Sequence, residues 1–140
     1  MVANLNPQWI VGFVDGEGCF YVGVLKNDTL RFGYQIQPEF TVVQHKRDIK
    51  LLYALKDYFG CGSVGINHGD RYHWRVKNLK NFIEVIIPFF EKHKLLGKRA
   101  IEFERFRDIC LLMDKGLHLT PEGFETIKEK AKNVRVKNLD

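Results

Sequence analysis

The chain has 140 residues, a formal net charge of +5 and an isoelectric point of about 9.1. Apolar residues make up 45% of it and aromatic residues 13%, which excludes an intrinsically disordered chain and suits one domain with a core. The basic balance permits nucleic-acid binding without requiring it. No apolar run reaches the ~20 residues of a membrane span, and the N-terminus has neither a signal-peptide nor a transit pattern. We therefore expect the protein to work in the compartment where it is made.

The cysteines and histidines form no metal-binding pattern. Cys19, Cys61 and Cys110 are an odd number without a CxxC spacing, so we expect reduced thiols in an intracellular protein. No zinc-ligand spacing links them to the histidines, which are His45, His68, His73, His93 and His118. The GxxxxGK loop that cradles phosphates is also absent from the sequence. These observations argue against a zinc finger and against a P-loop nucleotide hydrolase.

A short helix that ends in two acids is predicted near the start of the chain. Asn6 and Pro7 provide a capping side chain and a first-turn proline. Residues 9–18 then read Trp-Ile-Val-Gly-Phe-Val-Asp-Gly-Glu-Gly, with apolar residues at helical spacing. Asp15 and Glu17 fall at the C-terminal end of this helix, where the helix dipole disfavours anions. Their placement indicates a compensating positive charge, such as a metal ion.

Two glycines lie one turn apart in the same helix. Gly12 and Gly16 each cost roughly 1 kcal/mol in a helix interior, and they leave a face that another backbone can approach closely. The decapeptide closely resembles the motif of the LAGLIDADG homing endonucleases. Every glycine, both acids and the apolar positions match, and Glu17 stands where the family has its second acid.

Strand and helix patterns alternate along the rest of the chain. Alternating apolarity predicts strands over residues 19–25, 31–43, 62–67 and 71–77. Helical spacing predicts helices over residues 46–59, 78–90, 95–113 and 120–133. Pro38 indicates a bend or an edge in the second strand, and Pro88 should end or kink its helix. Phe32 and Ile66 are expected to face the core, while residues 134–140 should be flexible because they have little to pack against.

This order resembles the core of a LAGLIDADG domain over roughly residues 6–113, including the basic segment at 97–99. The resemblance implies an α+β fold of αββαββα order, with an antiparallel DNA-binding sheet and extra C-terminal helices. We expect one domain over residues 1–140, with a last helix at about 120–133. The sequence has no internal repeat and holds one copy of the motif.

Family members with one motif pair two motif helices at a twofold axis. The resemblance therefore implies a homodimer whose interface includes Trp9, Gly12, Phe13 and Gly16. It implies no other protein partner and no membrane. Each chain would bring one Glu17 to the centre of the dimer, one for each strand of the DNA.

The motif acids suit a magnesium site for phosphodiester hydrolysis. That reaction needs a divalent metal to stabilise charge on the phosphate and to activate water. Magnesium prefers carboxylate, carbonyl and water oxygens, which the Glu17 side chain and the Gly16 carbonyl offer. Mn²⁺ or Ca²⁺ is expected to replace it in binding. The resemblance makes Asp15 a packing residue at the helix end, and the alternative reading of Glu17 is a plain surface carboxylate.

Two further catalytic residues follow from the resemblance. Gln44 ends the second strand on the core parity, and it would orient the water network. Lys98 matches the basic residue that the family places near the scissile phosphate. Lys94 or Arg99 could fill that role instead, and each of these could equally be a solvated surface group.

Polar side chains follow the outward parity of the predicted strands. Arginine pairs with guanine and glutamine with adenine in the major groove, and a sheet can read that groove. The residues that we expect to face the bases are Tyr21, Arg31, Gln35, Gln37, Glu39, Thr41, Ser63, Asn67, Arg71, His73, Arg75 and Lys77. The residues that we expect to touch phosphates, which position without specifying, are Lys26, Asn27, Lys46 and Arg47. A solvated sheet face is the alternative interpretation.

The resemblance as a whole implies a homodimeric, site-specific DNA endonuclease encoded in an intron. It would use magnesium to make a staggered cut with 3′ overhangs at a long pseudo-palindromic site. Such a protein would act in a chloroplast, a mitochondrion, or a bacterial or archaeal cytoplasm. One rival is an RNA maturase or other binding-only protein of the same fold that assists splicing. A DNA-binding regulator is a second rival, although regulators of this fold usually add a helix-turn-helix domain, for which this chain has no room.

Overall fold

The computed structural model describes residues 4–136, and its elements follow the expected order. They are α1 (Pro7–Glu17), β1 (Gly18–Lys26), β2 (Tyr34–His45), η1 (Lys46–Asp48), α2 (Ile49–Phe59), β3 (Ser63–His68), β4 (Arg71–Val76), α3 (Leu79–Asn81), η2 (Phe82–Ile86), α4 (Ile87–Lys92), α5 (Lys98–Asp114), η3 (Leu117–Leu119) and α6 (Pro121–Ala131). This confirms the α+β class, the αββαββα order and the extra C-terminal helices. Among the described residues, none of the helices has both the length and the apolar character that a membrane crossing needs.

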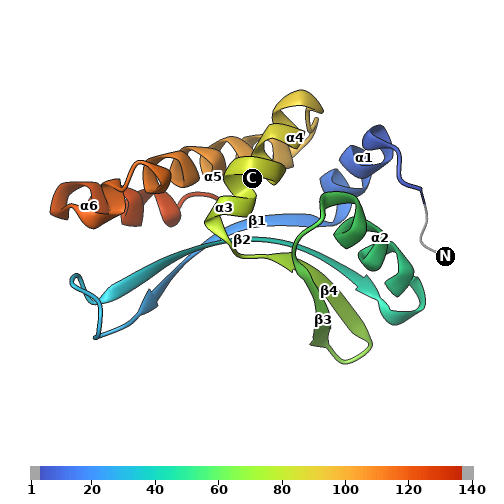
Figure 1. Cartoon of the computed structure of the whole chain (residues 1–140), viewed down its shortest axis with the longest axis horizontal. Coiled ribbons are helices and arrows are strands. Elements are labelled where there is room, and N and C mark those ends of the chain that lie inside the picture. The colour runs from blue at the N-terminus through green and yellow to red at the C-terminus, as the bar shows by residue number, and fades with distance from the viewer. Residues whose placement is uncertain (1–3, 137–140) are drawn as a thin grey trace.

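The strands form one antiparallel sheet in the order β1-β2-β4-β3. Figure 1 shows the sheet as an arch with the helices packed on its convex side. The concave side carries no helix in the described part of the chain. Alternation along each strand explains this arrangement, because one parity is apolar and meets the helices while the other is polar.

The core lies between the arch and the helices. Phe20 of β1 and Phe40 of β2 are fully buried and stack with ring centroids 4.5 Å apart. Trp74 of β4 and Phe106 of α5 close the cluster at 5.5 Å from Phe40 and 5.2 Å from Phe20, respectively. Each such side chain contributes about 1.5–3 kcal/mol by leaving water. The inward parity predicted for β1, β2 and β4 is thereby confirmed, except that Tyr34 at the start of β2 is 36% exposed.

Two expectations for the strands are wrong. β2 begins at Tyr34 and not at residue 31, because residues 27–33 form a wide turn that closes at Gly33 with a positive φ of 79°. Phe32 is still packed inward, since its ring lies 5.0 Å from that of Phe124 in α6. Ile66 is 66% exposed, because the β3–β4 hairpin extends beyond the helices that cover the rest of the sheet (Figure 1).

Pro38 and Pro88 are both accommodated without a break. Pro38 lies in the part of β2 that pairs with β1 alone, so its missing amide costs no ladder bond to β4. Pro88 does not end its helix, which continues to Lys92. The turn before it, Phe82–Ile86, widens into a π-helix, which relieves the contact between the proline ring and the preceding turn.

The C-terminal part differs from expectation in two places. α5 begins at Lys98 and not at residue 95, because residues 93–97 form a loop. The segment after α6 has more to pack against than we expected: Val134 is 1% exposed and the Val136 amide is hydrogen-bonded. Residues 137–140 lie outside the described residues. The opening of α6 is as predicted, because the Thr120 hydroxyl accepts a hydrogen bond from the Gly123 amide at 3.0 Å.

Candidate functional site

The outer face of α1 is open in the single chain. The Asn6 side chain caps the helix by accepting a hydrogen bond from the amide of Gln8 at 2.7 Å. A Cβ atom placed on Gly12 or Gly16 would meet no atom within 4 Å, so packing within residues 4–136 does not require either glycine. Trp9 is 40% exposed and stacks on Phe13, with ring centroids 4.7 Å apart. The four residues proposed for a dimer interface therefore lie on one face of α1, where Phe13 also packs partly against the core while Trp9, Gly12 and Gly16 stay exposed in the described part of the chain.

The junction of α1 and β1 fixes the position of Glu17. Gly18 follows with no linker, and its amide donates to the Val14 carbonyl. A Cβ at Gly18 would lie 2.7 Å from Val14 Cγ1 and 2.9 Å from Val14 O, so any larger residue would force the helix away from the strand. Gly18 pairs with Val42, which places the exposed Glu17 beside the end of β2.

Gln44 and Lys98 lie near the same end of the sheet. Gln44 is half-buried and is the residue before the last of β2. It lies two residues beyond Val42, the partner of Gly18, and so close to the end of α1. Lys98 is exposed at the first position of α5. Arg99 is 12% exposed and its guanidinium is paired with Glu102 at 2.8 Å, so it is already neutralised within the chain. Of the three basic candidates, Lys98 and the exposed Lys94 keep a solvated ammonium.

The partners of two carboxylates were not predicted from the sequence, although Asp15 itself was expected to pack at the helix end. Asp15 accepts hydrogen bonds from the amides of Leu96, at 2.9 Å, and of Gly97, at 3.2 Å. Nothing in the sequence marks that pairing, since the partners are 81 and 82 residues away. Glu102 is 1% exposed and binds Arg99 and the C-terminal segment. A signal for it did exist, because Glu102 precedes the core residue Phe106 by one helical turn.

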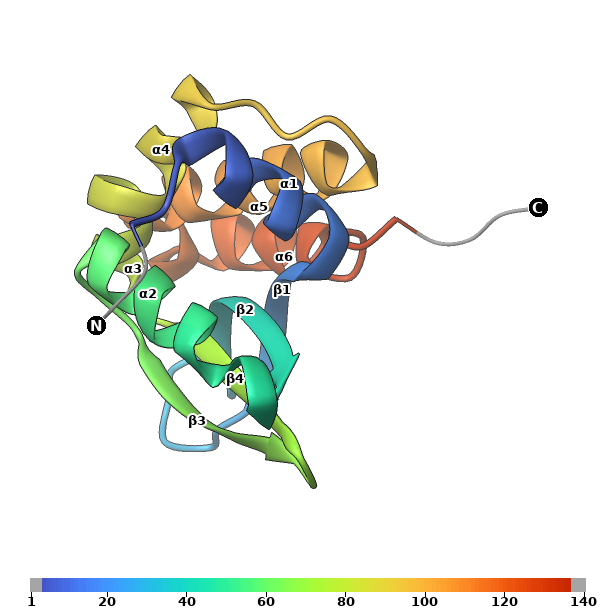
Figure 2. The ribbon, with the colours of Figure 1, turned by 90° about the vertical axis from the view of Figure 1, so that its right-hand side faces the viewer.

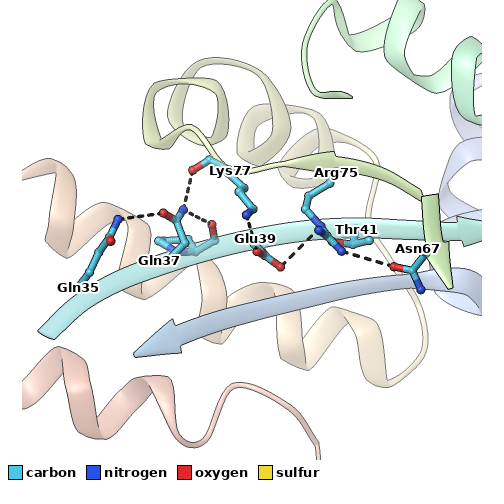
Figure 3. Close-up of polar contacts among 8 residues, drawn as sticks. Gln35, Gln37, Glu39, Thr41, Asn67, Arg75 and Lys77 are labelled. Atoms are coloured by element: carbon cyan, nitrogen blue, oxygen red, sulfur yellow. Dashed lines mark hydrogen bonds and ion pairs between the residues drawn. The ribbon is translucent and has the colours of Figure 1, made fainter. Parts of the chain in front are cut away.

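The concave face carries a connected set of polar side chains, drawn in Figure 3. Arg75 on β4 donates to Thr41 on β2 at 3.2 Å and to Asn67 at 3.5 Å. The carboxylate of Glu39 lies 3.8 Å from Arg75 Nε and 3.4 Å from Lys77 Nζ. These contacts hold the long cationic side chains in place before any ligand arrives.

Two glutamines extend this set along β2 (Figure 3). The Gln37 amide donates to the carbonyls of Pro38 and Lys77, both at 2.9 Å, and its oxygen accepts from Gln35 at 3.2 Å. Gln37 is therefore oriented by the chain itself. Gln35 is exposed, and among the described contacts its side-chain oxygen has no partner.

His73 lies on the same face and is held neutral. Burial, and secondly the Arg75 guanidinium, lower the pKa of His73 below its ordinary value of 6.5. Its Nδ1 atom is buried without a hydrogen-bond partner in the described part of the chain. The charge of the face at neutral pH therefore comes from its arginines and lysines, with Glu39 as the opposing group.

The remaining expected contacts lie at the two ends of the arch. Lys26, Asn27 and Arg31 belong to the β1–β2 hairpin end, and Arg31 precedes β2 instead of lying on its polar face. Lys46 and Arg47 lie at the other end, where Lys46 Nζ is 3.6 Å from Asp70 on the surface. The following residues lie between or beside these ends on the outward parity of the strands: Tyr21, Ser63 and Arg71. The site residues thus form an elongated band, within which Ser63, His73, Arg75 and Lys77 line one shallow hollow.

The donor set for a metal is small. No group of three His, Cys, Asp or Glu side chains that could hold an ion occurs within residues 4–136. At the end of α1, the Glu17 carboxylate is exposed, and the Gly16 carbonyl belongs to the last turn, whose carbonyls lack helical partners. Magnesium is usually held by one or two carboxylates together with water and substrate phosphates. These residues fit such an ion, with its other ligands supplied from outside the chain.

Comparison with known proteins gives a consistent result. The family model described as LAGLIDADG endonuclease matches residues 10–110. The "Probable intron-encoded endonuclease 2" of Neurospora crassa is 35% identical over 129 residues, which are 91% of this chain and 28% of that protein. The chain spans only 24–28% of the length of the first three curated relatives that it matches.

Two solved structures are similar over nearly the whole chain. The homing endonuclease I-TnaI is 51% identical with a TM-score of 0.91, over 97% of this chain and 92% of that one. I-SmaMI, solved bound to uncleaved DNA in the presence of calcium ions, is 31% identical with a TM-score of 0.91, over 96% of this chain and 47% of that one. The motif, the fold and the family match agree, and the chain belongs to the LAGLIDADG endonuclease family.

Proposed function

We propose that the protein is a site-specific DNA endonuclease that hydrolyses phosphodiesters with a divalent metal. The observation that carries the proposal is the exposed Glu17 at the α1–β1 junction, at the end of a concave face lined with cationic and amide side chains. The family of the chain supports it, as does the similarity to I-SmaMI, which has been solved with cleaved DNA. The cut would be staggered, with 3′ overhangs.

In this proposal each residue near the junction has a separate role. Glu17 and the Gly16 carbonyl would hold magnesium, which when bound stabilises charge on the phosphate and activates water. Gln44 would orient water at the end of β2. Lys98, or the exposed Lys94 in its place, would put an ammonium beside the phosphate that is cut, because Arg99 is already paired with Glu102.

The concave face would bind the DNA. The preorganised Arg75 and the exposed Gln35 are suited to base edges in the major groove. Lysines and arginines at the two ends of the arch would contact phosphates and set the register. An arch open on one side fits a duplex better than a flat sheet would, since more strands can reach the groove.

We further propose that two copies act together. The sequence holds one motif and therefore one Glu17, whereas a double-strand cut needs two sites. The open face of Trp9, Gly12, Phe13 and Gly16 would form an isologous contact, with the same patch used twice. I-SmaMI supports this reading, because this chain matches 47% of it. The target would then be long and roughly palindromic.

The experiment is to incubate the protein and magnesium with a randomised DNA library and to sequence the cut ends. Glu17→Gln keeps the size of the side chain but removes the anion, so cutting should collapse while binding to the same site in a gel shift persists. Glu125→Gln, an exposed change on α6, is the matched control and should cut normally. Cutting by Glu17→Gln at nearly the wild-type rate would refute the mechanism. Binding without any cutting by the wild type would favour the splicing-assistance reading.

A further inference from the structure

We propose that Asp15 is a positioning residue, which holds the start of α5, and with it Lys98, against the end of α1. The proposal rests on the proposed nuclease function and assigns a role to the first acid of the motif. Asp15 Oδ2 accepts from the Leu96 amide at 2.9 Å, and Oδ1 accepts from the Gly97 amide at 3.2 Å. Each carboxylate oxygen thus has its own backbone donor, which fixes both the distance and the rotation of the loop relative to α1.

The loop that Asp15 holds has other contacts at its two ends. The His93 amide donates to the Phe89 carbonyl at 2.8 Å, and the Ala100 amide donates to the Gly97 carbonyl at 2.9 Å. Residues 93–97 contain no helix or strand (Figure 2), and Leu96 is 86% exposed. Leu95 is buried and anchors the loop from the core side. Figure 2 shows the loop passing from α4 to the start of α5 beside α1. The Asp15 contacts are therefore what joins the exposed part of this loop to the motif helix.

The charges at the start of α5 favour a carboxylate from another part of the chain. The N-cap residue is Gly97, which has no side chain to cap the helix, and the first turn contains no acid. Instead α5 opens with Lys98 and Arg99, which lie at the positive end of the helix dipole and are disfavoured there. Glu102 neutralises Arg99 from within α5. Asp15 supplies a carboxylate next to the residue that precedes Lys98.

Two functional charges therefore sit at unfavourable helix ends, with Asp15 between them. Glu17 is an anion at the C-terminal end of α1, and Lys98 is a cation at the N-terminal end of α5. Asp15 precedes Glu17 by two residues and binds the residue directly before Lys98. A single side chain thus sets the spacing between the group that would hold the metal and the group that would face the phosphate. Errors of about 1 Å in such spacing can cost on the order of 100-fold in rate.

The test uses Asp15→Asn, which keeps one acceptor but replaces the other with a donor. We expect single-turnover cleavage to slow by about 10- to 100-fold. Binding of the same DNA in calcium should stay within about twofold, because the contacts of the concave face are untouched. Amide hydrogen exchange at Leu96 and Gly97 should become faster in the free protein. Asp114→Asn, an exposed change at the other end of α5, is the control and should alter none of these readings.

A double mutant separates positioning from general weakening of the fold. If Asp15 acts through Lys98, adding Asp15→Asn to Lys98→Ala should slow cleavage no further than Lys98→Ala alone. If the two substitutions together slow cleavage by the product of their separate effects, the proposal is wrong. It is also wrong if Asp15→Asn cleaves at the full rate while the amides of Leu96 and Gly97 exchange freely. If the wild type cuts no DNA, the nuclease proposal fails. Hydrogen exchange then still decides whether Asp15 holds the loop, and unchanged protection in Asp15→Asn would refute it.

Discussion

The carboxylate of Glu102 accepts a hydrogen bond from the Val136 amide at 2.8 Å, which ties the second turn of α5 to the segment after α6. Its other oxygen binds the Arg99 guanidinium at 2.8 Å. Because Glu102 is 1% exposed, these two partners replace the water that the charge would otherwise need. One buried carboxylate therefore joins the first turn of α5, next to the proposed site, to the C-terminal segment.

Glu102→Ala should destabilise the protein by about 3–5 kcal/mol, because it leaves the largely buried Arg99 guanidinium without its carboxylate partner. Glu102→Gln should cost less, since an amide oxygen can still accept from one of the two donors. The measurement is urea unfolding followed by circular dichroism. Glu129→Ala is the control: its pair with Lys132 is on the surface, so its loss should cost at most about 1 kcal/mol. An equal loss in both variants would show that Glu102 has no special role.

Gly12→Leu should change the dimer and the isolated chain in opposite directions. In the single chain the new Cβ atom meets no described atom within 4 Å, and replacing a helical glycine should raise stability by roughly 1 kcal/mol. In the dimer it would separate the two helices, so sedimentation on DNA should show the monomer and double-strand cutting should be lost. Gly60→Leu is not a suitable control, because Gly60 has a positive φ of 70° that leucine would strain. The control is Gly12→Ala, whose smaller side chain should weaken the dimer less than Gly12→Leu. A stable Gly12→Leu dimer would contradict the interface.

Arg75→Ala should change the preferred base at one position of each half-site, at a cost of roughly 1–3 kcal/mol for that base. Lys46→Ala should instead weaken binding to all sequences alike. The slope of the logarithm of the DNA affinity against the logarithm of the salt concentration should fall by about 1, the loss of one phosphate contact. The two can be compared by sequencing the DNA selected by each variant and by titrations at several salt concentrations. An unchanged preference profile for Arg75→Ala would show that the concave face does not read bases there.

The stability of the protein should fall below about pH 6.5, partly because of His73. Burial and the neighbouring Arg75 lower the pKa of His73 in the folded state, whereas the unfolded chain keeps the ordinary value of 6.5. The unfolded state then binds more protons, so the contribution is complete above 6.5 and is lost as the pH falls toward the folded pKa. His73→Gln should flatten the loss seen in unfolding curves between pH 7 and 5. Burial also lowers the pKa of His118, so His118→Gln should flatten it separately.

The sequence alone determined the features that depend on near neighbours in the chain. The alternation around Phe20, Phe40 and Trp74 was enough to place the inward faces, because side chains alternate with a period of two along any strand. The cap at Asn6 and the glycines of α1 identified the motif helix, and the motif identified the family. The alternation did not predict the exposure of Ile66, because that exposure depends on how far the covering helices extend over the sheet.

The tertiary structure decided what depends on residues far apart in the chain. No local pattern could show that Asp15 binds Gly97 or that Glu102 holds Val136, whereas the i,i+3 spacing of Arg99 and Glu102 did offer a signal for their pair. A hydrogen bond joins groups that the fold brings within about 3 Å, and that proximity depends on the packing of whole helices and not on sequence spacing. The sequence therefore named the acids and bases of the site. The packing of α1 against α5 decided which of them are held by the chain and which stay free for a substrate.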